Sequence, residues 1–157
     1  MTEARLATLD DWQGLKDLWA SFQKTRFTKY IDASLSDLGH YLSNSLSVPD
    51  RIGLLVLTVD EKIVGITTLC AVVNPQMHLP GCPIAVNGFI HVAYITPGLE
   101  SSAGLLLSQA IDNWCFQRGC KNVFGHVRMD GNFNAFFRKY NFKKWHYVIG
   151  REVAQSG

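Results

Sequence analysis

Hydrophobic positions near the start of the chain predict a strand followed by a helix. Residues 3–8 have a strand pattern, and apolar residues then recur at helical spacing from Trp12 to Phe22. Thr8 and Asp11 precede this stretch in a capping pattern. The apolar stripe of this helix should face the core.

A second helix and a hairpin are expected next. Ser34 has Asp37 three residues later, which is the spacing of a capping box, and a leucine stripe follows on one face. The runs 52–59 and 63–73 are rich in β-branched and aliphatic residues, and the polar residues 60–62 between them suit a turn. Both runs are almost continuously apolar, so we expect central strands that are covered on both faces.

The second half of the chain predicts a strand, helix, strand unit. Residues 85–95 have a strand pattern, a strongly apolar helix is expected over 102–118 with Gly119 as its stop, and residues 121–129 form the next strand. A crossover of this kind places its two strands parallel, within an otherwise mainly antiparallel sheet. Two further elements are expected after this unit: a short helix over 132–140 and a last strand over 142–153.

The order of elements predicts an α/β fold with a mixed sheet and four flanking helices. The chain has 157 residues, of which 47% are hydrophobic, so a substantial core can be buried. No repeat or linker-like stretch divides the sequence, and we expect a single domain over residues 1–157.

Charge and cysteine usage give little reason to expect a nucleic-acid partner, a membrane partner or a disulfide framework. The 15 basic and 13 acidic residues form no long single-sign run, so neither nucleic acid nor a membrane is expected as a partner. The four cysteines contain no CxxC pair, and the first residues include no apolar signal segment, which favours a cytoplasmic protein with free thiols. His78 and Cys82 share one loop, but two ligands are too few for a metal site.

The loop over 97–104 has the features of an anion site. It joins a strand to a helix, where free backbone N–H groups and the positive end of the helix dipole point outward. Ala103 and Gly104 leave room for close approach, and the hydroxyls of Ser101 and Ser102 can add donors. A common alternative explains the same residues equally well, with one serine as a simple N-cap.

The stretch from Tyr94 to Phe142 resembles the acetyl-CoA-binding core of the GNAT N-acetyltransferases. The resemblance lies in the strand end, the small-residue loop, the Leu-rich helix and the segment that starts at Asn132. It implies a GNAT-like fold with acetyl-CoA as co-substrate and no metal. It also implies two groups of cofactor contacts: Ala93, Tyr94 and Ile95 for the pantetheine, and Glu100, Ser101, Ser102, Ala103, Gly104 and Leu105 for the pyrophosphate. Leu99 stands where the family has Gln or Arg.

Two histidines are candidate bases. His91 lies four residues before Ile95, where the resemblance places a Glu or His that takes the proton of the amine. An imidazole suits this step because it titrates near neutral pH. Alternatively, His91 is a buried structural histidine. His126, on the following strand, is the second candidate, near the opening between the parallel strands.

The segment 136–142 resembles the family pattern Phe-Tyr-x-Lys-x-Gly-Phe, in which the tyrosine protonates the departing thiolate. Phe137 takes the place of that tyrosine, so it can pack against the cofactor but cannot donate a proton. Tyr140 is the nearest substitute on the expected helix. Asn132 lies where the family has an asparagine that contacts the cofactor, although capping explains it equally well.

The acceptor site should be walled by the first two helices, with Phe27, Tyr30 and Tyr41 as aromatic candidates. Nearby lysine and arginine residues favour an acidic or carboxylate-bearing acceptor, and a solvated loop with buried rings is the alternative.

Two functions follow from these residues. The first is an N-acetyltransferase that moves acetyl from acetyl-CoA to a primary amine of a small molecule or protein within a ternary complex. The second is a weakly active or inactive protein of the same fold that binds acyl-CoA or a protein partner as a regulator. Oligomeric state is left open, a homodimer included.

Overall fold

The computed structural model describes residues 1–25, 34–73, 85–125 and 139. Contacts group the chain into two units, Met1–His126 and Val127–Gly157, and the fold described below belongs to the first unit. The expected helix over 132–140, apart from residue 139, and the expected strand over 142–153 lie outside the described residues. The prediction of a single domain stays a prediction.

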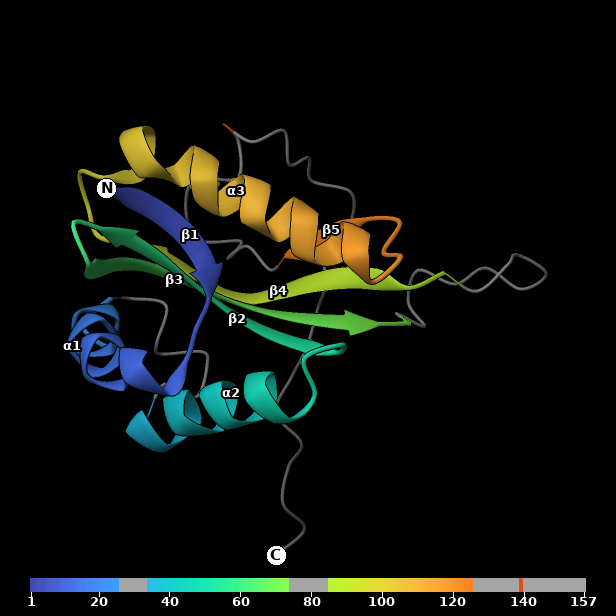
Figure 1. The fold of residues 1–157 in the computed structure, drawn as a ribbon, viewed down its shortest axis with the longest axis horizontal. Helices are drawn as coiled ribbons and strands as arrows, with labels where there is room; N and C mark the ends of the chain where they lie inside the picture. Colours follow the sequence, from blue (N-terminus) through green and yellow to red (C-terminus); the bar gives the residue numbers. More distant parts are fainter. Residues whose placement is uncertain (26–33, 74–84, 126–138, 140–157) are drawn as a thin grey trace, which may run out of the picture. The chain divides into compact units, whose positions relative to one another are not determined.

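The described residues contain one mixed sheet in which the strands lie in chain order (Figure 1). Its strands are β1 (Thr2–Leu6), β2 (Ile52–Val59), β3 (Lys62–Val72), β4 (Asn87–Ile95) and β5 (Val123–Gly125). The pairs from β1 to β4 are antiparallel, whereas β4 and β5 are parallel. The predicted mixed sheet with one parallel pair is therefore confirmed.

Helices cover both faces of this sheet. Helices α1 (Trp12–Phe22) and α2 (Leu35–Ser47) lie on one face, and α3 (Glu100–Gln117) lies on the other (Figure 1). A short 3-10 turn, η1 (Leu9–Asp11), leads into α1. Strands β2 and β3 are buried along almost their whole length, as their apolar sequences predicted. The described part thus contains three of the four expected helices.

Local interactions define where several helices and strands begin or end. The capping box at α2 is formed, because the Asp37 amide donates to Ser34 Oγ over 3.1 Å and the Ser34 amide donates to the Asp37 carboxylate over 2.7 Å. The hairpin turn between β2 and β3 is tighter than predicted. Asp60 and Glu61 both have positive φ, 46° and 67°, which is typical of a two-residue type I′ turn, so Lys62 already belongs to β3.

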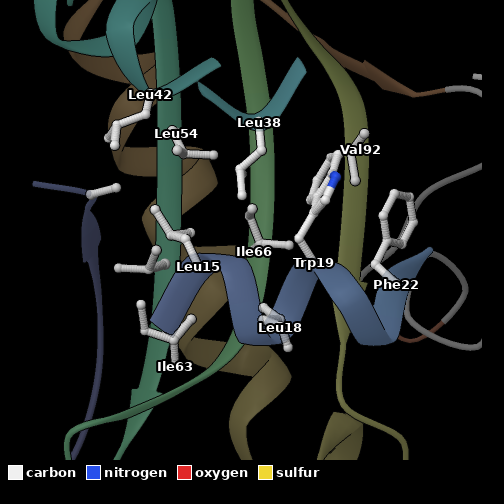
Figure 2. Packing of buried hydrophobic residues seen from close by; sticks show 12 residues of the cluster. Leu15, Leu18, Trp19, Phe22, Leu38, Leu42, Leu54, Ile63, Ile66 and Val92 are labelled. Atoms are coloured by element: carbon white, nitrogen blue, oxygen red, sulfur yellow. The ribbon is translucent and has the colours of Figure 1, made fainter. Parts of the chain in front are cut away.

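An apolar core, shown in Figure 2, lies between the sheet and the helices α1 and α2. It is built from α1, α2, β2, β3 and β4, and includes Leu15, Leu18, Trp19, Phe22, Leu38, Leu42, Leu54, Ile66 and Val92. Burying each large apolar side chain contributes roughly 1.5–3 kcal/mol. The Trp19 indole also donates to the Ser34 carbonyl over 3.1 Å, which fastens the start of α2 to α1.

Helix α3 packs tightly on the opposite face. Trp114 is buried, and a Cβ at Gly53 of β2 would lie 2.6 Å from its Nε1 atom, so only glycine lets the indole rest on that strand. The Arg118 guanidinium lies 4.1 Å from the Trp114 ring centroid and donates to the Pro49 carbonyl through Nε over 2.9 Å. These contacts hold the end of α3 against the connection between α2 and β2.

The C-terminus of α3 carries two of the described thiols. Gly119 has φ of 69°, and the Cys120 amide donates to the Cys115 carbonyl over 3.0 Å, which closes the helix in a Schellman arrangement. Cys70, Cys115 and Cys120 are free, in line with the predicted free thiols. Burial raises the pKa of the Cys115 thiol to about 12, so this thiol stays protonated at neutral pH.

A partly buried ion pair fixes the connection between β1 and α1. The Arg5 guanidinium donates to both carboxylate oxygens of Asp11, over 2.7 and 2.8 Å, and the Thr8 amide donates to the same carboxylate over 2.8 Å. The pKa of Asp11 lies below its ordinary value, mainly because of the bond from Arg5 and then because of the bond from Thr8. Because Thr8 takes part in these bonds, strand β1 ends at Leu6, two residues before the predicted end.

The Arg5–Asp11 pair should make stability fall in acid. Because the folded chain keeps Asp11 ionised to lower pH than the unfolded chain does, its contribution is present above about pH 4 and is lost as pH falls through the lower folded value. We expect Asp11→Asn to lower the free energy of unfolding by about 1–3 kcal/mol at pH 7. Urea titrations of both proteins should show this difference shrinking towards pH 2, and a constant difference would contradict the assignment.

Candidate functional site

A β-bulge in β4 lies at the centre of the candidate site. On β3, the consecutive residues Thr68 and Leu69 pair with Val92 and Ile90, so His91 is an extra residue without a register partner. A bulge of this kind re-aims side chains and locally bends the strand. The side chain of His91 therefore does not follow the alternation of side chains in a regular strand.

The extra residue changes which side chains share a face of the sheet. Val92 packs in the core under α1 and α2, while the rings of His91 and Tyr94 contact α2 and α1 respectively. In an uninterrupted strand, His91 and Tyr94 would face opposite sides, because they are an odd number of residues apart. The bulge therefore brings both rings to the same side.

His91 lies beside the expected acceptor residue Tyr41. The two ring centroids are 5.9 Å apart with a tilt of 53°, and the His91 side chain is exposed. The alternative of a buried structural histidine is thus wrong. The structure brings together two residues that sequence analysis had named for different roles, one on β4 and one on α2.

A continuous row of rings connects His91 with Tyr94. Tyr41 is 6.1 Å from Trp19, Trp19 is 4.9 Å from Phe22, and Phe22 is 5.5 Å from Tyr94, measured between ring centroids. Trp19 and Phe22 were expected in the core stripe of α1, and their helical spacing carries no signal for a place beside a site. In the row, these two rings lie between Tyr41 and Tyr94.

Two threonines of β3 bind the residue next to His91. The Val92 amide donates to Thr68 Oγ1 over 2.9 Å, and Thr67 Oγ1 donates to the Val92 carbonyl over 2.8 Å. Both threonines are buried. Leaving a buried main-chain group unpaired costs about 1–3 kcal/mol, so these bonds stabilise the bulge. Neither threonine was predicted from the sequence as part of the site.

The loop between β4 and α3 presents the start of a helix that lacks a side-chain cap. Its N-cap is Leu99, whose side chain cannot accept a hydrogen bond, and α3 begins at Glu100 rather than at the predicted Ser102. The alternative in which Ser101 or Ser102 is the N-cap is therefore wrong. The first intrahelical bond runs from the Ala103 amide to the Leu99 carbonyl over 3.0 Å. In an α-helix, the amides that precede the first intrahelical bond have no acceptor four residues back within the helix.

The other expected cofactor residues differ in exposure. Ala103 and Gly104, in the first two turns of α3, are buried, whereas Leu105 is 52% exposed. On β4, Ala93 and Tyr94 are half-buried and Ile95 is buried.

Several candidate residues lie outside the described residues. These are Phe27, Tyr30, His78, Cys82, His126, Asn132, Phe137 and Tyr140. Among the residues that are described, no group of three or more His, Cys, Asp or Glu side chains could hold a metal ion. Within the same ranges, no helix is both long enough and apolar enough to cross a membrane.

Comparison with solved structures identifies the fold. AAC(6')-Iy in complex with the bisubstrate analog CoA-S-monomethyl-acetylneamine matches with a TM-score of 0.75, over 99% of both chains, at 14% identity. Glucosamine-6-phosphate N-acetyltransferase from Arabidopsis thaliana matches with a TM-score of 0.69, over 97% of this chain and 98% of that chain, at 13% identity.

A third neighbour has a different description. A transcriptional regulator from Bacillus halodurans C-125 matches with a TM-score of 0.69 over 98% of this chain and 100% of that chain, at 16% identity. No protein-family model matches the sequence, and no curated protein matches it either.

The similarity to these solved structures shows that this chain has the fold of the GNAT acetyltransferases, as the sequence resemblance implied. At these identities the likeness defines the fold, and the activity has to be argued from the site.

The loop before α3 allows a matched test of its expected cofactor role. Gly98 has φ of 92° and Gly119 has φ of 69°, and among the described residues a Cβ at either position would meet no atom within 4 Å apart from those of its chain neighbours. Gly98→Ala and Gly119→Ala should each destabilise the fold by about 1–2 kcal/mol through backbone strain alone. Only Gly98→Ala should also weaken acetyl-CoA binding in isothermal titration calorimetry, because Gly119 lies at the other end of α3. Equal affinities of both variants would contradict a cofactor role of this loop.

Proposed function

We propose that this chain is an N-acetyltransferase that moves an acetyl group from acetyl-CoA to a primary amine. The observation that carries the proposal is the exposed imidazole of His91 on the bulge of β4, beside Tyr41. The fold supports it, because the neighbour AAC(6')-Iy binds the bisubstrate analog CoA-S-monomethyl-acetylneamine.

In this proposal His91 acts as the general base. Attack on a thioester requires a neutral amine, and an imidazole in contact with solvent can take the proton directly or through a water molecule. The amine nitrogen then forms a bond to the carbonyl carbon, and the bond between that carbon and sulfur breaks. The products are the acetylated amine and coenzyme A, whose thiolate takes up a proton.

The start of α3 is proposed to receive the pyrophosphate of acetyl-CoA. The first-turn amides of an α-helix have no acceptor four residues back within the helix, and the helix dipole favours negative charge at this end. The buried Ala103 and Gly104 provide no bulky side chain next to this turn. Glu100 adds a negative charge to the same turn, which opposes phosphate binding.

The proposed acceptor is a small molecule with a primary amine. Two neighbours support this class: AAC(6')-Iy, which is named an aminoglycoside N-acetyltransferase, and glucosamine-6-phosphate N-acetyltransferase. Tyr41 is proposed to contact the acceptor, because its ring lies against His91, where the amine has to be deprotonated. We also propose a cytoplasmic setting, which suits the three free thiols of the described residues.

A regulatory protein of the same fold is the second candidate. The neighbour described as a transcriptional regulator supports it, since it covers nearly the whole of this chain at a similar TM-score. Leu99 as the residue before α3 also removes the polar side chain that the family has there.

Thermal-shift titration with acetyl-CoA and with coenzyme A separates these candidates. A ligand that binds only the folded chain raises the apparent stability, by about 2.7 kcal/mol at a hundredfold excess over Kd. Release of free thiol in the presence of an amine panel then tests for turnover. Binding without turnover favours the regulator, and no shift at saturating ligand contradicts both the transferase and an acyl-CoA-binding regulator.

Replacing His91 should slow the reaction. We expect His91→Ala to lower the rate of thiol release at least tenfold, about 1.4 kcal/mol, because the proton of the amine loses its acceptor. His40→Ala is the matched control, since His40 is also exposed but lies on α2 and is only the sequence neighbour of Tyr41. An unchanged rate in His91→Ala would remove His91 from the mechanism.

A further inference from the structure

We infer that Thr67 and Thr68 of β3 are positioning residues for His91, because their hydroxyls hold the bulge that brings its imidazole to Tyr41. Thr67 and Thr68 are thereby added to the residues that shape the candidate site around His91. In its link to turnover this inference rests on the proposed function, whereas its structural part can be tested without any reaction.

Both main-chain polar groups of one residue are bonded to these hydroxyls. The Val92 amide donates to Thr68 Oγ1 over 2.9 Å, and the Val92 carbonyl accepts from Thr67 Oγ1 over 2.8 Å. Val92 directly follows the extra residue His91, at the point where the register of the ladder shifts. The two hydroxyls therefore act at the bulge itself.

The hydroxyls reach Val92 from opposite faces of the sheet. Thr68 pairs with Leu54 and Val92, which both pack in the core under α1 and α2, so its side chain lies on that face. Successive side chains of a strand alternate, which places Thr67 on the α3 face. Thr67 is 0% exposed and Thr68 is 3% exposed, so water does not compete for these bonds.

Loss of the hydroxyls should let the strand relax toward a regular ladder. In a regular ladder, a shift of one residue moves every following side chain to the other face. His91 and Tyr94 could then no longer lie on the same side, and the contact between His91 and Tyr41 would be lost. Valine is the suitable replacement because it keeps the branched shape of threonine and removes only the hydrogen-bonding group.

The test reads the His91 ring directly. In protein labelled with ¹³C-histidine, the His91 signal is assigned with His91→Gln, and Tyr41→Leu gives its position without the neighbouring ring. We expect the His91 signal of Thr67→Val and of Thr68→Val to move toward the position seen in Tyr41→Leu. Thr67→Ser and Thr68→Ser keep the hydroxyl and should keep the wild-type signal.

Turnover provides a second readout. We expect each valine variant to lower kcat about tenfold while KM for acetyl-CoA changes less than about twofold, with the serine variants close to wild type. Thr58→Val is the matched control, because Thr58 is a buried strand threonine whose hydroxyl donates to the Glu3 carbonyl over 3.4 Å on the β1 side of the sheet. This control should change neither the His91 signal nor kcat.

The possible results separate the role of the two threonines from the proposed transferase activity. A wild-type His91 signal in both valine variants overturns the inference, whatever the turnover. An equal change in Thr58→Val also overturns it, since the effect would then be a general loss of stability. If Thr68→Val does not fold, Thr67→Val alone decides the test, because it removes the bond to the Val92 carbonyl and leaves the Val92 amide paired with Thr68 Oγ1. Absence of turnover in the wild-type protein contradicts the proposed function alone and leaves the signal test valid.

Discussion

One residue without a partner on β3 determines which side chains of β4 face the helices α1 and α2. If His91 were part of a regular ladder, either its ring or that of Tyr94 would lie on the α3 side of the sheet. The bulge allows both to border the same row of rings. Because the candidate base and the expected pantetheine strand belong to one continuous segment, a single local irregularity links the two halves of the candidate site.

The surrounding fold keeps this irregularity in place. Strand β3, which carries Thr67 and Thr68, is itself buried between β2 and β4 and covered on both faces, so its side chains have little freedom to move. The rings of Trp19 and Phe22, both from α1, pack against each other next to this region, and the Trp19 indole donates a hydrogen bond to the Ser34 carbonyl. A functional side chain that stands on such rigid elements keeps its geometry better than one on a loop.

Elements specified by local chemistry could be predicted from the sequence. The Ser34–Asp37 box, the apolar run that became β2 and the parallel pair of β4 and β5 all depend on residues close together in the chain or on the crossover between them. His91 and Tyr41 could also be named as candidates, since each has a residue type and a position that suit the chemistry.

The features that escaped prediction depend on pairing between distant segments. Ile90, His91 and Val92 read equally well as a regular strand, because a bulge exists only relative to the register of the partner strand. The start of α3 was misplaced for a different reason. Serine is a preferred N-cap and leucine is not, so the sequence favoured Ser101 or Ser102 over the residue that holds this position, Leu99.

The buried thiol of Cys115 has a practical consequence for spectroscopy and labelling. Alkylating reagents and mixed-disulfide probes attack the ionised sulfur, and this sulfur remains in its protonated form at neutral pH. Dyes or spin labels introduced through a new surface cysteine should therefore attach there in preference to Cys115, so the packing of α3 against Gly88 would survive the modification.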